Sequence, residues 1–381
     1  MDHIEPYKKR DHALDGIRGI ACLIVFFSHF MQFFLPSVFF QNQHDHYGEK
    51  YISETPLNIL YNGQFAVMIF FVLSGMVLSI PFFRGKDFAW YSRSIIKRYP
   101  RLAIPTLAST VFSYVLMLII GFHQADTSVY SLSSAIPGMP TEPDLLTALW
   151  EGAIGSYFYG VQTFNPVLWT IKTELIGSIL VLVSVPLLCA TRIRFVFYVI
   201  GIVVFRSDYL IGFVLGVICA DLSINIKKIN GFIIFLLIVT GVYLGSYPYF
   251  ITDNGLWYSG ADINLFSFKI ISIAFGSMFI VIAVDKAKAV AFIFNTKICK
   301  FFGDISYSLY LVHFPIIASL SSLLIIKLSV NGFRYSIALA ITFVVSILIS
   351  IAIAYLFKKA IDDNAISISN KIASRILPSS K

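Results

Sequence analysis

The sequence has few charged residues for its length. Only 13% of its 381 residues are Asp, Glu, Lys or Arg, whereas 57% are hydrophobic. A soluble domain carries about 25% charged residues, so this composition argues against a water-soluble protein. The long apolar stretches instead predict an all-α, polytopic membrane protein, because helices satisfy their backbone hydrogen bonds internally in lipid.

Cysteine and the common catalytic motifs are also scarce. The four cysteines form no Cys-x-x-Cys pair, so we expect packing residues rather than a disulfide framework or a zinc site. The sequence has no GxxxxGK[ST], GxSxG or HExxH motif. ATP hydrolysis, serine-hydrolase chemistry and zinc proteolysis therefore lack support. The run His44-Asp45-His46 is too short and isolated to predict a metal site.

Ten apolar stretches are candidates to cross a hydrocarbon core of about 30 Å. They lie near residues 17–35, 65–83, 102–121, 167–190, 194–205, 208–222, 231–248, 267–285, 305–326 and 335–357. The fifth and sixth are short, and Arg206 and Asp208 between them are consistent with a tight helical hairpin. The first is too long for a cleavable signal peptide, so we expect it to act as the insertion signal.

The distribution of Lys and Arg supports these spans and orients them. If the N-terminus is cytoplasmic, 22 of the 29 Lys and Arg residues fall in cytoplasmic segments and 3 at or within spans. The four outside are Lys50, Arg206, Lys327 and Arg334. This asymmetry predicts that both termini are cytoplasmic. The net charge of +8 follows membrane topology and forms no separate basic stripe, so nucleic acid is not an expected partner.

The chain reads as one membrane domain over residues 1–360 with a short basic cytoplasmic tail over 361–381. The longest outside segment, 122–166, has four acidic residues and no Lys or Arg. Within it, the moderately apolar stretch Leu145–Tyr159 predicts a re-entrant or surface helix.

Ionisable residues inside spans are candidates for function, because charge is costly in lipid. Arg18 and His29 are 11 residues apart, which places them on one helix face about 16 Å apart along the axis. Such a face suits a long ligand with an anionic end at Arg18 and a reactive end at His29. A snorkelling arginine and a structurally bonded histidine are the alternative.

The next cytoplasmic segment carries two arginines three residues apart. On a helix, Arg98 and Arg101 would be neighbours, and two guanidinium groups can clamp a phosphate by bidentate contacts. An ordinary topogenic charge cluster is the alternative interpretation.

Two further titratable residues lie within spans. Glu174 follows Trp169 in the fourth span, where it could orient His29, bind a hydroxyl of the acceptor, or form a helix-to-helix hydrogen bond. Lys172 is two residues away and faces another side of the helix. His313 precedes Pro315, a residue that kinks helices, and this position favours a structural role over a catalytic one.

Five blocks in order resemble the acyltransferase-3 family. They are Leu14–Ala21 with His29 completing an Arg-x10-His pattern, Phe70–Gly75, Arg98–Arg101 with Pro105, Leu168-Trp169 with Glu174, and Gly303–Pro315. Each block is modest alone, but five in family order between residues 14 and 315 are specific. Val312 departs from the tryptophan that relatives often have before His313.

The resemblance implies an integral membrane O-acyltransferase, often one that uses acetyl-CoA and acetylates sugar hydroxyls of bacterial surface polysaccharides or glycolipids. It implies a multi-pass protein of the bacterial inner membrane, without the esterase-like domain fused to some relatives. His29 would then act as base or carry the acyl group, with Glu174 beside it, while Arg18, Arg98 and Arg101 bind acyl-CoA. A transporter or flippase with buried His, Glu and Arg residues is the alternative, and the lack of internal repeats weighs against it.

Overall fold

The computed structural model describes most of the chain. The described residues are 12–40, 43–53, 55–132, 139–140, 142, 144–191, 193–248 and 265–378. Regular structure in these ranges is entirely helical, as the composition predicts. Lys8, Lys9, Arg10, Arg192 and Lys381, which support the charge asymmetry, lie outside the described residues.

The helices follow one another with short connections. In chain order they are α1 (His12–Phe34), η1 (Pro36–Val38), α2 (Lys50–Ser53), η2 (Pro56–Leu60), α3 (Gly63–Phe83), α4 (Phe88–Ile119), α5 (Gln124–Ser131), α6 (Leu145–Trp150), η3 (Glu151–Tyr159), η4 (Pro166–Leu168), α7 (Trp169–Leu188), α8 (Arg194–Val204), α9 (Ile211–Asn225), α10 (Gly231–Gly245), α11 (Leu265–Lys286), α12 (Lys288–Phe294), α13 (Lys297–Ile316), η5 (Ile317–Ser321), α14 (Ser322–Val330), α15 (Tyr335–Phe357), η6 (Lys358–Asp362) and α16 (Asp363–Ile376). The segments η3, η5 and η6 are π-helical, and η1, η2 and η4 are 3₁₀ turns.

Seven helical stretches among the described residues are long and apolar enough to cross a bilayer. They are Ala13–Phe34, Gly63–Phe83, Phe88–Ile119, Pro166–Leu188, Phe268–Lys286, Lys297–Val330 and Tyr335–Ile376. The fifth to seventh predicted spans correspond to the shorter apolar helices α8, α9 and α10. Every predicted span therefore coincides with a helix, while ten full crossings and their orientation stay predictions.

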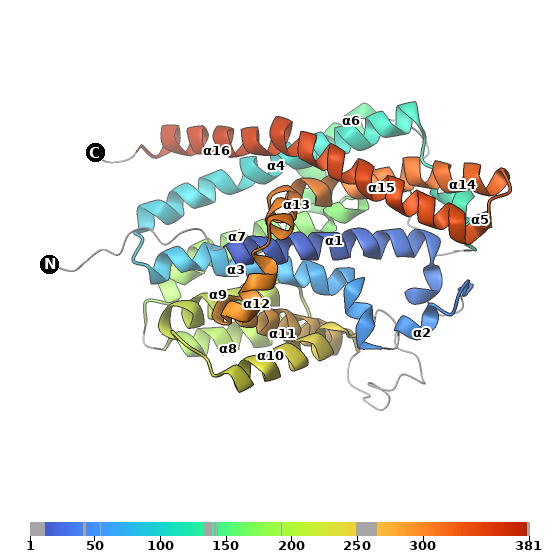
Figure 1. Ribbon diagram of the computed structural model, residues 1–381. Coiled ribbons are helices and arrows are strands. Elements are labelled where there is room, and N and C mark those ends of the chain that lie inside the picture. The colour runs from blue at the N-terminus through green and yellow to red at the C-terminus, as the bar shows by residue number, and fades with distance from the viewer. Residues whose placement is uncertain are drawn as a thin grey trace.

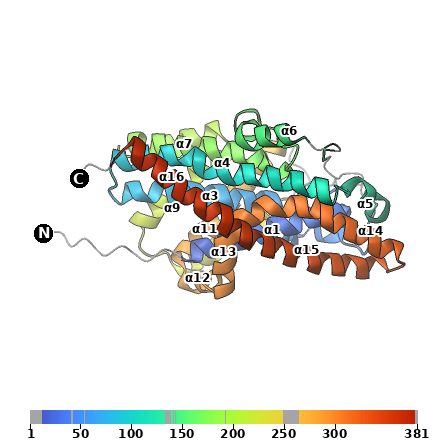
Figure 2. The same ribbon diagram turned by 90° about the horizontal axis from the view of Figure 1, so that it is seen from above.

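The helices form an elongated bundle with α1 in its interior (Figure 1). α1 packs against α3 and α13, and α3 packs in turn against α7, α9 and α11. The last residues of α16 lie at one end of the bundle, and the start of α1 lies in the half of the bundle nearest that end (Figures 1 and 2). α2, α5 and the junction of α14 with α15 lie at the opposite end (Figure 1).

Glycines allow the central helices to approach closely. A Cβ added to Gly216 of α9 would lie 2.8 Å from the Cα of Gly75 in α3 and 2.7 Å from the backbone nitrogen of Met76. Small residues at helix contacts are a common way to pack helices tightly in membranes. Gly75 belongs to the second sequence block, so this part of the block has a packing role.

α4 begins 14 residues before the predicted span at residue 102. Its N-terminus is capped by Asp87, whose side chain accepts a hydrogen bond from the backbone N–H of Trp90 at 3.0 Å. Arg98 and Arg101 therefore lie inside a 32-residue helix rather than in a loop. Hydropathy alone missed this extension because its charged residues lower the mean hydropathy of residues 88–101.

The predicted tail is mostly helical as well. α15 continues through η6 into α16, which packs along α4 (Figure 2). The buried residues Ala365, Ser369 and Ala373 recur every four positions, and these small side chains form one face of α16. Arg93 Nε donates to the carbonyl of Leu377 at 3.1 Å. Residues 363–376 are thus packed on the bundle.

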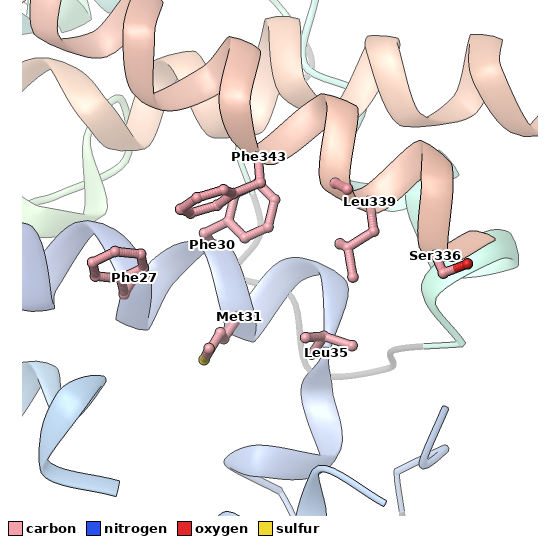
Figure 3. Close-up of a pocket in the computed structure, with 8 residues that line it drawn as sticks. Phe27, Phe30, Met31, Leu35, Ser336, Leu339 and Phe343 are labelled. Carbon is pink, nitrogen blue, oxygen red and sulfur yellow. The ribbon is translucent and has the colours of Figure 1, made fainter. Parts of the chain in front are cut away.

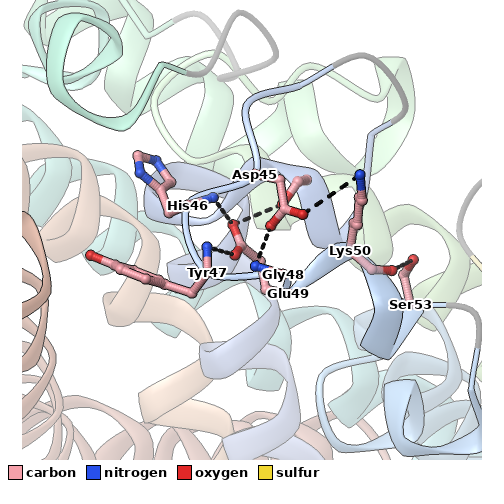
Figure 4. Close-up of polar contacts among 8 residues, drawn as sticks. Asp45, His46, Tyr47, Gly48, Glu49, Lys50 and Ser53 are labelled. Carbon is pink, nitrogen blue, oxygen red and sulfur yellow. Dashed lines mark hydrogen bonds and ion pairs between the residues drawn. The ribbon is translucent and has the colours of Figure 1, made fainter.

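A compact loop follows α1 at the far end. The Glu49 carboxylate accepts hydrogen bonds from Ser37 Oγ at 2.8 Å and from the backbone N–H groups of His46 and Tyr47 at 3.0 and 2.7 Å (Figure 4). The His46 ring stacks on Tyr335 with centroids 4.4 Å apart. Through these contacts the loop packs against both the segment after α1 and the start of α15.

Candidate active site

The site is built on the contact between α1 and α13. A Cβ added to Gly19 would lie 2.5 Å from the backbone nitrogen of Gly303 and 2.7 Å from the carbonyl carbon of Phe302. Gly303 in turn lies directly against the backbone of Asp15. These glycines come from the first and last sequence blocks. Their close approach sets the distance between the side chains that the two helices present to each other.

Farther along these helices, two histidines meet. His29 Nδ1 lies 2.9 Å from His313 Nε2, and the other ring nitrogen of His313 lies 3.0 Å from the carbonyl oxygen of Leu309. His313 is only 1% exposed, whereas His29 is half-buried. The arrangement places a fully buried His313 ring beside a partly buried His29.

Aromatic rings surround the histidine pair. Phe314 contacts the His29 ring edge-on with centroids 5.1 Å apart, and Phe26 lies 6.3 Å from both His313 and Phe343. Phe26 thus lies next to both His313 and Phe343 of α15, so this side of His313 is apolar.

An apolar groove of about 310 Å³ lies between α1 and α15. Its lining, drawn in Figure 3, comprises Phe27, Phe30, Met31, Leu35, Ser336, Leu339, Ala340 and Phe343. Ser336 is the only polar side chain among them. Such a surface suits hydrocarbon rather than a polar reaction, so the groove is not the catalytic site.

A second cluster lies around Glu174 of α7. Arg98 Nη2 of α4 forms an ion pair with Glu174 Oε1 at 2.6 Å, and Ser74 Oγ of α3 donates to the same oxygen at 3.1 Å. The side chains of Arg98 and Glu174 are 15% and 17% exposed. Glu174 therefore joins three helices, and its described hydrogen bonds go to Arg98 and Ser74 rather than to His29.

The remaining arginines are close enough to affect the same carboxylate. The charges of Arg18, Arg98 and Arg101 all act on Glu174. Arg18 also contacts Asp15 at 3.5 Å. No carboxylate lies within 4 Å of the Arg101 guanidinium in the part of the chain that the structure describes, although its charge acts on Glu174 and on Asp362. Among the described residues Arg98 is the predicted arginine that contacts Glu174, while Arg18 and Arg101 act on it through their charge.

The sequence singled out each of these residues but not their pairings. α1 is uninterrupted from His12 to Phe34, so Arg18 and His29 keep the predicted spacing. The bond from His29 to His313 and the one from Glu174 to Ser74 join helices that are distant in sequence. The new partners, His313 and Ser74, both lie inside the five sequence blocks that resemble the family. Their place in these blocks was the only sign in the sequence that they belong to the site.

The segment before α7 is held by a buried acid. The Glu151 carboxylate of η3 accepts hydrogen bonds from the backbone N–H groups of Thr163, Phe164 and Asn165 at 2.9, 3.0 and 3.4 Å. Burial raises the pKa of this carboxyl above its ordinary value, although the backbone donors oppose that shift. Residues 145–159 are helical, as predicted, and Glu151 ties them to the start of α7.

Asn165 extends this anchor to α13. Its amide nitrogen donates to Ser109 Oγ of α4 and to the carbonyl oxygen of Leu311 of α13, both at 2.7 Å. Ser109 donates to the same Leu311 carbonyl at 3.0 Å. The network fixes α4, α7 and α13 relative to one another close to His313.

No metal centre is evident among the described residues. No group of three or more His, Cys, Asp or Glu side chains in these ranges is placed to bind a metal ion. The rings of His44 and His46 contact each other with centroids 4.7 Å apart. All four cysteines are buried and free.

The fold and the site define a helical integral membrane protein with a histidine pair and an arginine–glutamate cluster inside its bundle. A profile of the acyltransferase-3 family, described as an acyltransferase domain, matches residues 11–357. The chain belongs to this family, and it is therefore a membrane acyltransferase. Searches among curated proteins and among solved structures gave no match.

Proposed function

We propose that the protein transfers an acetyl group from acetyl-CoA to a hydroxyl of a sugar in a surface polysaccharide or glycolipid, in a bacterial inner membrane. The observation that carries this proposal is the histidine pair inside the bundle. His29 remains half-buried while its partner His313 is fully enclosed. An imidazole oriented by a hydrogen bond is the usual base for activating an alcohol.

The chemistry assigns His29 a defined proton transfer. The acceptor hydroxyl oxygen attacks the carbonyl carbon of the thioester as a ring nitrogen of His29 takes the hydroxyl proton. The carbon–sulfur bond then breaks, and the protonated His29 returns its proton to the leaving sulfur, which gives free CoA. His29 is unchanged at the end of this cycle.

The arginines suit the other end of the donor. Coenzyme A carries its phosphates far from the thioester, and Arg18 lies about 16 Å along α1 from His29. We assign Arg18 and Arg101 to the phosphates, because a guanidinium forms bidentate contacts with them. Arg98 contributes charge at the same place, and Glu174 holds it in position through their ion pair.

A direct test compares surface glycans from cells with and without the gene by mass spectrometry. The proposal expects a loss of mass equal to one acetyl group per modified sugar in the deletion strain, restored by the wild-type gene but not by His29→Ala. Identical glycan masses in both strains would contradict the proposed acceptor. A mass difference other than acetyl would contradict the proposed donor.

A further inference from the structure

The hydrogen bonds around His313 determine which nitrogen of His29 is available for reaction. A carbonyl oxygen only accepts hydrogen bonds, so the His313 nitrogen facing Leu309 carries a hydrogen. His313 is 1% exposed and forms no ion pair with a carboxylate among the described residues, and a charged imidazolium inside a bundle would be costly. His313 is therefore neutral.

The proton on His313 Nδ1 then determines which nitrogen of His29 is protonated. In a neutral imidazole whose Nδ1 is protonated, Nε2 is an acceptor. This acceptor lies 2.9 Å from His29 Nδ1, so Nδ1 of His29 carries the hydrogen that joins the two rings. The Nε2 atom of His29 keeps its lone pair.

We propose that His313 is a positioning residue that holds His29 in the Nδ1-protonated form, with Nε2 as the atom that takes the proton from the acceptor hydroxyl. The inference rests on the proposed function of His29 as base. The Leu309 carbonyl, His313 and His29 form an ordered chain of hydrogen bonds, and the backbone carbonyl of Val25, on the same helix as His29, also faces the His29 ring. Its order is set by backbone geometry, because the carbonyl belongs to the same helix turn as His313.

As a partner for His29, the neutral ring of His313 differs chemically from a carboxylate. A neutral imidazole accepts one hydrogen bond and adds no negative charge beside the base. His29 thus receives orientation without a carboxylate, while Glu174 is engaged by Arg98 and Ser74. The charged cluster and the proton-accepting ring are kept separate.

Two amide substitutions distinguish positioning from packing. In His313→Gln the side-chain oxygen can occupy the place of Nε2 and accept from His29, but the bond to Leu309 is lost. In His313→Asn the amide can retain the bond to Leu309 but is too short to reach His29. If His313 is purely structural, His313→Asn should be the more active variant. If His313 positions His29, His313→Gln should be the more active variant.

The kinetic experiment uses the full-length protein in lipid vesicles, radiolabelled acetyl-CoA, and glycan-bearing membranes of the producing cells as acceptor. His313→Asn is expected to lower kcat by up to about 100-fold, the cost of a misplaced catalytic group, with the KM for acetyl-CoA unchanged, and His313→Gln to retain clearly more activity. His44→Gln, at an exposed histidine, serves as control and should match wild type. Equal loss in both amide variants, or higher activity in His313→Asn, would overturn the proposal.

Nitrogen NMR of histidine-labelled protein reads the tautomer without requiring activity. The signals of His29 are identified by their absence in His29→Ala. The proposal expects a protonated Nδ1 and an unprotonated Nε2 in wild type, and loss of this preference in His313→Phe. A protonated Nε2 in wild type would refute the tautomer, whereas absent acyl transfer with the expected tautomer would refute the proposed function instead.

Discussion

Arg98 and Arg101 differ sharply in their surroundings although they are three residues apart. Arg98 is paired with Glu174 at 2.6 Å, and Arg101 has no such partner in the described residues. We expect Arg101→Ala to weaken acetyl-CoA binding by about 10- to 100-fold, equivalent to one charge-assisted contact of about 1.5–3 kcal/mol. Calorimetric titration of acetyl-CoA measures the affinity.

Arg98→Ala should behave differently, because it leaves Glu174 buried without its cation. Removing one partner of a buried ion pair costs about 3–5 kcal/mol, so this variant should be destabilised as well as weaker in binding. The double variant Arg98→Ala with Glu174→Gln is the matched control, and it should recover stability but not affinity. Wild-type acetyl-CoA affinity in Arg101→Ala would return that arginine to a purely topogenic role.

At this scale the sequence predicted the candidate residues but not their contacts. His29, Glu174 and Arg98 stand out because charged or titratable groups are rare inside apolar spans. The two histidines are 284 positions apart, and Arg98 and Glu174 are 76 apart. No local spacing rule relates such residues, so only the packing of helices reveals which side chains meet.

At the scale of elements, the contact of α1 with α13 sets the geometry of the histidine pair. Gly19→Ala places a Cβ against the backbone of α13, and backbone cannot move aside as a flexible side chain can. We expect a loss of about 1–3 kcal/mol in stability, typical of overpacking, and reduced acetyl transfer. Thermal unfolding in detergent and the transfer assay measure the two effects.

Gly231 provides the control for this substitution. A Cβ added there meets no atom within 4 Å, so Gly231→Ala at the start of α10 should leave stability and transfer unchanged. If Gly19→Ala were as stable and active as Gly231→Ala, the close approach of the two helices would not control the site.

Glu151, in the helix before α7, should make the stability of the protein depend on pH. Because burial raises its pKa in the folded protein, the folded state keeps a proton at pH values where the unfolded chain, with a pKa of about 4.3, has lost it. Stability should therefore fall as pH rises through the window between the two pKa values. Unfolding midpoints measured across this window should decline in wild type and change less in Glu151→Gln.

The exposed residue Glu142 supplies the comparison for Glu151. Glu142→Gln should show the same decline with pH as wild type. An equally steep decline in Glu151→Gln would show that another group causes it.

Helices were predictable from the sequence where they are long and apolar, and less so where they are polar. Every predicted span coincides with a helix because long apolar runs have few other solutions in lipid. The first half of α4 and the whole of α16 were missed because their polar residues conceal helices that depend on packing against each other. Propensity is a weak guide where tertiary contacts decide.

At the scale of the whole molecule, the predicted orientation awaits a direct test. Reporter fusions after residue 90 should report the cytoplasm, and fusions near residue 130 should report the outside, because cytoplasmic loops retain Lys and Arg. Both chain ends should be cytoplasmic, which agrees with the start of α1 and the end of α16 lying in the same half of the bundle (Figure 1). Reversed reporter signals would contradict the orientation.

The order of sequence blocks indicated the family, but the arrangement of helices around α1 was not readable from it. Hydrophobic runs predict which helices cross the membrane but do not predict which helices are neighbours. Glycines such as Gly19, Gly75 and Gly303 carried part of this information, although their partners were unknown. The three-dimensional neighbours follow from shape complementarity, which is a property of pairs of helices.

The central claim is that His29 takes the proton of the acceptor hydroxyl, and the most direct measurement is acetyl transfer by purified His29→Ala alongside its acetyl-CoA affinity. We predict a fall in turnover of about 10²- to 10⁴-fold, the usual cost of losing a general base, with affinity and membrane level unchanged. His29→Gln should be equally inactive because an amide cannot accept the proton. Turnover above about a tenth of wild type in His29→Ala would contradict the account.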